Sequence, residues 1–239
     1  IVDWNVGNVT NMSFMFSGAQ DFTQNIGNWD TSSVTTMRQM LQNTSAFNRS
    51  INNWDVSNVT NMFGMFYNAV IFNKPLNSWD VSSVSNMGGM FAQAHAFNQP
   101  LNNWDVSSAT SMRIMFNGAI AFDQPIGDWD VSSVTNMDSM FQSARSFNQP
   151  IGNWDVSSVT NMKQMFNFAL VFNQNISSWN VSNVTNMSSM FKAPLQVNAN
   201  AFNQNLSSWS VANVVNCTQF SFQAVQYTLP KPNFTNCTP

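Results

Sequence analysis

Methionine pairs are the first residues in this sequence whose type and spacing suggest chemistry. All sixteen methionines fall into M-x-x-M pairs, from Met12 and Met15 to Met187 and Met190. Thioether sulfur is a soft ligand that suits Cu(I). A phenylalanine or leucine follows the second methionine of each pair, however, and methionine also fills irregular gaps in protein cores. We therefore interpret the pairs as core residues and predict no metal site there.

An aspartate column is the second candidate site. The motif W-D-V recurs every 25 residues and gives Asp30, Asp55, Asp80, Asp105, Asp130 and Asp155. If the repeats stack as strands about 4.8 Å apart, neighbouring carboxylates repel each other by about 1 kcal/mol in water. Two explanations stay open. The serines that follow each aspartate can donate hydrogen bonds to it, as in Asx turns, or a cation such as calcium or a basic partner lies along the stripe.

Residues for catalysis are scarce. His95 is the single histidine, it lies in the segment AQAHAF, and the chain has eleven Asp and no Glu. We find no Ser-His-Asp or Cys-His arrangement, no phosphate-binding loop and no zinc-ligand spacing. The sequence therefore predicts a protein that is not an enzyme and needs no cofactor, with calcium as the one candidate ion.

Composition narrows the classes of partner. Charged residues make up 8% of the 239-residue chain and the net charge is −3, whereas soluble domains carry roughly 25% charged residues. The sequence has no basic run, which argues against nucleic acid as a partner. It also has no apolar run near the roughly 20 residues of a membrane-spanning helix. We expect a neutral polar surface and no direct membrane insertion.

An internal repeat organises the whole chain. Seven successive tryptophan intervals are 25 residues and the last is 30. A unit this short cannot bury its own apolar face, so the units must stack. We predict one domain, with a repeat solenoid over residues 1–216 and a C-terminal cap over 217–239. The nine units begin near Trp4, Trp29, Trp54, Trp79, Trp104, Trp129, Trp154, Trp179 and Trp209.

Two periodicities within a unit predict its elements. The L-x-x-W-D-V segment, for example 101–106, alternates apolar and polar residues and predicts a short inward-facing strand. Met112, Met115, Phe116 and Ala119 follow at i, i+3, i+4 and i+7, which predicts a short helix or 3₁₀ turn. The predicted fold class is thus an α/β, leucine-rich-repeat-like solenoid, with parallel strands on one face and short helices opposite. An asparagine column in the turn after each helix, such as Asn73 and Asn98, is interpreted as an internal ladder.

The ends of the repeat differ from its middle. Cys217 replaces a methionine in the last unit and Cys237 lies in the tail, so we predict a disulfide that pins the tail over the end; two reduced thiols are the alternative. Ile1 already stands at the strand position of the first unit, which predicts an open apolar edge where copies of the chain could dock. The insertion at 192–202 is a second candidate contact.

Asparagine sequons support an extracellular compartment. The motif N-x-S/T marks acceptors for N-glycosylation on secreted proteins. Sequons cluster towards the two ends and leave residues 74–174 bare. The candidate acceptors are Asn8, Asn43, Asn48, Asn58, Asn175, Asn183, Asn205, Asn216, Asn233 and Asn236.

The repeat also resembles a known family. Residues 98–116, NQPLNNWDVSSATSMRIMF, are similar to the BspA-type leucine-rich repeat, in the 25-residue variant found in mycoplasma surface lipoproteins and in secreted proteins of microbial eukaryotes. The likeness spans nearly the whole chain. It implies surface display, adhesion or host contact and does not imply catalysis.

Together these features predict a non-catalytic extracellular or cell-surface protein. It would mediate protein–protein contact or assembly, either as an adhesion module or as a component of a filament or coat. Its partners would be proteins, including copies of itself at the N-terminal edge. The alternative is a recognition module that binds a polysaccharide, a cation-bridged ligand or a regular lattice such as ice.

Overall fold

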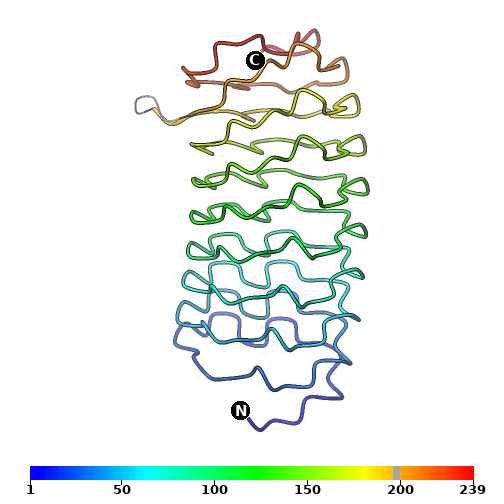
Figure 1. Ribbon diagram of the computed structural model, residues 1–239, viewed down its shortest axis with the longest axis vertical. Helices are drawn as coiled ribbons and strands as arrows, with labels where there is room; N and C mark the ends of the chain where they lie inside the picture. Colours follow the sequence, from blue (N-terminus) through cyan, green and yellow to red (C-terminus); the bar gives the residue numbers. More distant parts are fainter. Residues whose placement is uncertain (196–199) are drawn as a thin grey trace.

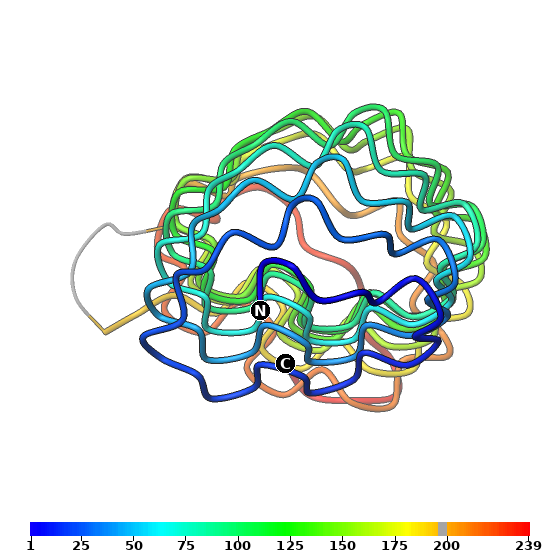
Figure 2. The same ribbon diagram turned by 90° about the horizontal axis from the view of Figure 1, so that it is seen from below.

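The protein is a stack of coils, each made by one repeat of the sequence. The computed structural model describes residues 1–195 and 200–239. The chain rises coil by coil from the N-terminus to the C-terminus (Figure 1), and the coils follow nearly the same outline when viewed along the stack (Figure 2). One parallel β-bridge joins each coil to the next, from Asn11 and Thr36 to Asn186 and Asn216.

The predicted α/β solenoid of strands and helices is wrong. The described residues contain no helix, and their β-structure is limited to these isolated bridges. Segment 101–106, expected to be a strand, begins with a turn in which the Trp104 N–H donates to the Leu101 carbonyl at 3.1 Å. The parallel contact lies further along each coil, in the T-N-M segment. Trp and Val nevertheless face inward and Asp outward, as the alternation predicted.

The segment expected to be a helix is a row of turns that bond to the next coil. In a helix each N–H donates to the carbonyl four residues earlier in the same segment. Here the Ile114 N–H donates to the Asp138 carbonyl of the next coil at 2.8 Å, while the Met115 N–H donates back to Met112 at 3.1 Å. Because alternate N–H groups point along the stack, the segment depends on its neighbour for its hydrogen bonds.

Left-handed backbone positions prevent a helix in this segment. The second residue between the two methionines has positive φ in every coil, as in Gln39 (φ 52°) and Ile114 (φ 51°), and a second positive-φ position follows two residues after the phenylalanine. A turn with φ > 0 at its third residue favours Gly or Asn. Ile114 is β-branched, so its conformation there is unusual. The apolar i, i+3, i+4, i+7 spacing therefore arises from a turn sequence, not from a helix.

The core consists of columns of identical side chains, and the predicted core role of the methionine pairs is confirmed. Met112 and Met115 are fully buried. Successive tryptophans stack with ring centroids 6.3 Å apart for Trp54 and Trp79, and Phe66 stacks on Phe91 at 5.5 Å. Offset stacking of this kind adds to the free energy gained by burial. The columns fix the register of one coil on the next.

Each buried tryptophan also makes a hydrogen bond across the coils. The Trp104 indole N–H donates to the Leu76 carbonyl at 3.0 Å, and the same bond recurs in the neighbouring coils. A buried indole N–H needs such a partner. The asparagine ladder is confirmed as well: the Asn98 N–H donates to Asn73 Oδ1 at 3.0 Å. Polar side chains thus repeat with the same register as the core.

The C-terminal tail covers the last coil. Cys217 and Cys237 form the predicted disulfide. Phe234 of the tail packs edge-on against Phe220 with ring centroids 5.0 Å apart, and the Leu206 N–H donates to the Pro230 carbonyl. The tail therefore supplies contacts that a further coil supplies elsewhere.

Replacing Trp104 by Phe should lower the free energy of unfolding by about 2 kcal/mol or more, because the bond to Leu76 is lost and the smaller ring leaves part of the buried indole volume empty. Urea unfolding followed by circular dichroism measures the change. Trp4→Phe is the matched control, since Trp4 is half-exposed. Equal effects of the two substitutions would show that the indole hydrogen bond does not stabilise the stack.

Replacing Gly18 by Ala should also cost about 1 kcal/mol, because L-residues are disfavoured at positive φ. Gly18 has φ 80°, and a Cβ there would meet no atom within 4 Å, so the substitution tests backbone strain alone. Ser17→Ala, at the adjacent position, is the control. A thermal melt that is unchanged by Gly18→Ala would contradict the turn geometry.

Candidate contact face

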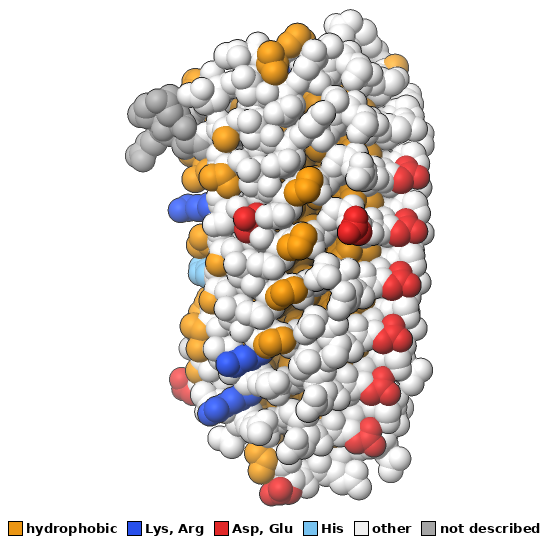
Figure 3. All heavy atoms as spheres, in the orientation of Figure 1, with side chains coloured by type: hydrophobic (Ala, Val, Ile, Leu, Met, Phe, Trp, Pro, Cys, Tyr) orange, Lys and Arg blue, Asp and Glu red, His pale blue; other side chains and the backbone are white. Residues whose placement is uncertain are grey.

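The aspartate column lies on the surface as one straight line. All six carboxylates are exposed, and Figure 3 shows a line of acidic side chains along one side of the stack. The exposed serine or asparagine and the exposed threonine of the same segments form parallel columns. We call the exposed Asp, Ser or Asn, and Thr side chains, with Ser85 in place of the Thr in one coil, the regular face; they belong to segments 30–35, 55–60, 80–85, 105–110, 130–135 and 155–160.

Each aspartate of the column is held by the serine two residues later. Asp80 Oδ1 accepts hydrogen bonds from the Ser82 N–H at 3.1 Å and from the Ser82 hydroxyl at 2.6 Å. Asp105 and Ser107 make the same pair of bonds. The Asx-turn explanation of the column is confirmed, and one carboxylate oxygen of each pair is committed to it.

These bonds keep the carboxylates ionised despite their neighbours. The Ser82 hydroxyl, followed by the Ser82 N–H, lowers the pKa of Asp80 below its usual value; desolvation and the Asp55 charge raise it, but by less. The pKa values of Asp30, Asp55, Asp105 and Asp155 are lowered for the same reason. Hydrogen bonding therefore outweighs the repulsion expected along the column.

The column has no cationic partner within the described residues. Their one ion pair joins Arg113 Nε to Asp138 Oδ2 at 3.1 Å, away from the regular face. The described residues also contain no group of three His, Cys, Asp or Glu side chains placed to hold a metal ion. The six charges thus face solvent as an unpaired line.

The threonine column is tied to the backbone. The Thr110 hydroxyl donates to the Ser85 carbonyl of the preceding coil at 3.2 Å, and the Thr135 hydroxyl donates to the Thr110 carbonyl at 3.2 Å. The hydroxyl groups are therefore fixed in position and repeat at the coil spacing.

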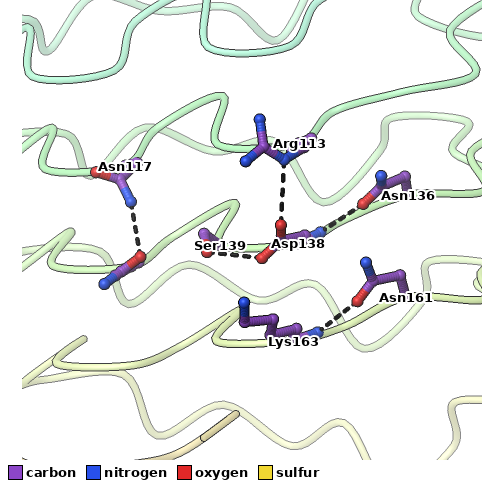
Figure 4. Close-up of polar contacts among 8 residues, drawn as sticks. Arg113, Asn117, Asn136, Asp138, Ser139, Asn161 and Lys163 are labelled. Carbon is purple, nitrogen blue, oxygen red and sulfur yellow. Dashed lines mark hydrogen bonds and ion pairs between the residues drawn. The ribbon is translucent and has the colours of Figure 1, made fainter. Parts of the chain in front are cut away.

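A second face was missed by the sequence reasoning. Most of the residues between the paired methionines, and most of the two that follow the phenylalanine, are at least partly exposed, although Ser139, Asn167 and Ser188 are buried. Figure 4 shows Arg113, Asp138 and Lys163 on successive coils. Arg38 belongs to the same column, with Lys192 nearby. We call the outward side chains at 13–14, 17–18 and the equivalent positions of later coils the turn face. The sequence could have indicated this face, because Arg38, Arg113, Asp138 and Lys163 all directly follow the first methionine of a pair.

Other predicted sites are dispersed. His95 is exposed and its Nε2 lies 3.2 Å from Gln93 Oε1. The first coil exposes apolar side chains, among them Trp4, of which 52% is accessible. The centre of the 192–202 insertion, residues 196–199, lies outside the described residues. Docking at either of these two places stays a prediction.

The sequon asparagines fall into three groups according to their exposure and their side-chain hydrogen bonds. Asn8, Asn175, Asn205, Asn216 and Asn233 are exposed. Three others donate from their side-chain amides to backbone carbonyls, namely Asn58, Asn183 and Asn236. Asn43 and Asn48 are half-buried in the ladders between coils. The first group therefore presents the most accessible acceptors.

Comparison with known proteins assigns the repeat to a family. A family model described as Mycoplasma protein of unknown function, DUF285, matches residues 1–102, 51–136, 72–169 and 122–234, which together span nearly the whole chain. The chain belongs to the DUF285 family. No curated protein and no solved structure matches it. Within the part of this DUF285 chain that the structure describes, no helix has the length and apolar character needed to cross a membrane.

Removing a serine of the regular face should change the acidity of its aspartate. In Ser82→Ala the pKa of Asp80 should rise towards the usual carboxyl value, because the largest stabilising hydrogen bond is lost. A pH titration of the carboxyl carbon by NMR measures this. Ser83→Ala, which removes a hydroxyl that is not bonded to Asp80, should leave the pKa unchanged.

The same pKa shift fixes the sign of its effect on stability. A folded-state pKa below the unfolded value contributes stability above the unfolded pKa, and this contribution disappears as the pH falls through the folded pKa. Ser82→Ala should therefore destabilise the stack slightly at neutral pH and have no effect at strongly acidic pH. The opposite trend would contradict the assignment.

Proposed function

We propose that this DUF285 chain is a non-catalytic repeat segment of an extracellular or cell-surface protein that mediates protein–protein contact or assembly. The regular face is the observation that carries the proposal. It presents the same Asp, Ser and Thr groups coil after coil in straight columns. Such a surface suits many weak, identical contacts, whose combined strength can far exceed that of each one.

The remaining features support the same reading. His95, the single histidine, is exposed and its Nε2 lies beside Gln93 Oε1, as in a surface residue. The Cys217–Cys237 disulfide fits an oxidising compartment. The likeness to BspA-type surface repeats and the exposed sequons support surface display. Proteins, including copies of the chain itself, are the proposed partners.

Neutralising part of the regular face tests the proposal. In the triple variant Asp55→Asn, Asp80→Asn and Asp105→Asn the Asx turns should persist, because Asn180 already accepts the Ser182 N–H in the same way at 3.2 Å. Beads coated with the unaltered chain should cluster with each other or adhere to a cell monolayer. The variant should reduce this by about fivefold or more if the columns act together.

A charge-matched variant provides the control. Asp3→Asn, Asp21→Asn and Asp123→Asn remove the same number of negative charges, but outside the regular face. This variant should leave clustering and adhesion unchanged. Equal losses in both variants would assign the effect to net charge. Failure of the unaltered chain to cluster or adhere would contradict the proposed function itself.

A further inference from the structure

The turn face is where the coils differ from one another. The two residues between the paired methionines are SF, RQ, FG, GG, RI, DS, KQ and SS in successive coils. The methionines themselves, and the Trp, Val and Phe columns, repeat almost without change. All coils share one backbone path, so folding alone does not require these differences. In repeat proteins, one face commonly carries the binding function while the rest maintains the stack.

The turn face carries charge opposite to that of the whole chain. Four of the eight basic residues lie on it, against one of the eleven acidic residues, so its net charge is 4 − 1 = +3 while that of the chain is −3. The acidic residue is Asp138, which is already paired with Arg113. The basic residues are Arg38, Arg113, Lys163 and Lys192. An anionic partner would therefore be attracted to the turn face and repelled from the regular face.

Aromatic rings lie beside these cations. The Arg38 guanidinium lies over the rings of Phe14 and Phe63, with its central carbon 5.3 and 5.6 Å from their centroids. Phe14 is about half exposed, and Tyr67 follows Phe63 on the same coil, also partly exposed. Cation–π contact holds the guanidinium in place with its outer edge still accessible. Charge and flat apolar surface are thus combined within three coils.

Amide side chains continue the turn face towards the C-terminus. Gln93 donates to Asn117 Oδ1 at 3.0 Å, and Asn117 donates to Gln142 Oε1 at 2.9 Å (Figure 4). In the next coil, Asn167 Oδ1 is buried and accepts no hydrogen bond from any described residue. The partly exposed members of this ladder are Gln93, Asn117 and Gln142, and Lys163 is exposed on the next coil.

We propose that the turn face binds an acidic polysaccharide that runs along the stack. Carboxylate or sulfate groups would pair with Arg38, Lys163 and Lys192, and sugar rings would lie against the exposed parts of Phe14 and Tyr67. The amides would exchange hydrogen bonds with sugar hydroxyls. Aromatic faces and neutral amides beside the cations favour a glycan over an acidic peptide, which would need the charges alone. This binding uses a different face from the proposed protein contact, so either can fail without the other.

The test compares two variants of equal charge. The first, Arg38→Gln with Lys163→Gln, alters the turn face. The second, Arg49→Gln with Lys74→Gln, removes two basic residues from segments 47–51 and 72–76, which lie outside the turn face. Binding of the full chain to immobilised polygalacturonate and to heparin is measured at low and at physiological salt. The first variant should weaken binding by about tenfold and the second should not. Polygalacturonate carries carboxylates alone whereas heparin carries carboxylates and sulfates, so binding of polygalacturonate shows that carboxylates suffice, and binding of heparin alone shows that sulfate groups are required.

Further arms separate glycan binding from general charge attraction. Neutral dextran should not bind, and poly-glutamate should bind more weakly than polygalacturonate. Tyr67→Ala should weaken binding to polygalacturonate and leave poly-glutamate unaffected. Equal binding of poly-glutamate and polygalacturonate would overturn the proposal in favour of an acidic peptide. Equal losses in both double variants, or no binding of either glycan at low salt, would overturn it outright.

Discussion

Hydrogen bonding along the stack is the constraint on which the rest of this structure depends. Alternate N–H groups of each turn segment donate to carbonyls of the next coil, so no coil can satisfy its backbone alone. The indole of each buried tryptophan adds a side-chain bond in the same direction. These bonds require every coil to have the same backbone path and the same register. The 25-residue period of all the tryptophan intervals but the last follows from that requirement, and so do the columns of identical side chains.

The sequence was sufficient to identify the core residues but not the secondary structure to which they belong. Trp104, Met112 and Met115 are buried as expected, because burial depends on the spacing of apolar residues and on little else. The helix was misassigned because a row of turns brings i, i+3, i+4 and i+7 inward as a helix does. The feature that separates the two is positive φ at positions such as Ile114 and Gln39, where the residue type gives no warning.

Some of the candidate sites could likewise be predicted from the sequence, and one could not. The aspartate column and its serine partners could be predicted, since a turn with Asp at its start and Ser two residues later is a local matter. The disulfide could be proposed because two cysteines allow one intrachain pairing. The basic turn face could not be found from single motifs. Successive charges on it are 25 to 75 residues apart in the sequence and come onto one face only when the coils stack in register.

The segment between the two phenylalanines of a coil tolerates extra residues better than the other parts of the coil. Five extra residues enter between Phe191 and Phe202, yet Phe202 still stacks on Phe172 at 5.9 Å and Trp209 on Trp179 at 6.3 Å. Extra chain length between these two phenylalanines leaves the columns in register, whereas one added residue inside a turn segment would displace the inward-facing side chains of that coil. Duplication or loss of whole 25-residue segments would likewise preserve this register. The length of the molecule can therefore change in steps of one coil, while the side chains that each coil presents stay the same.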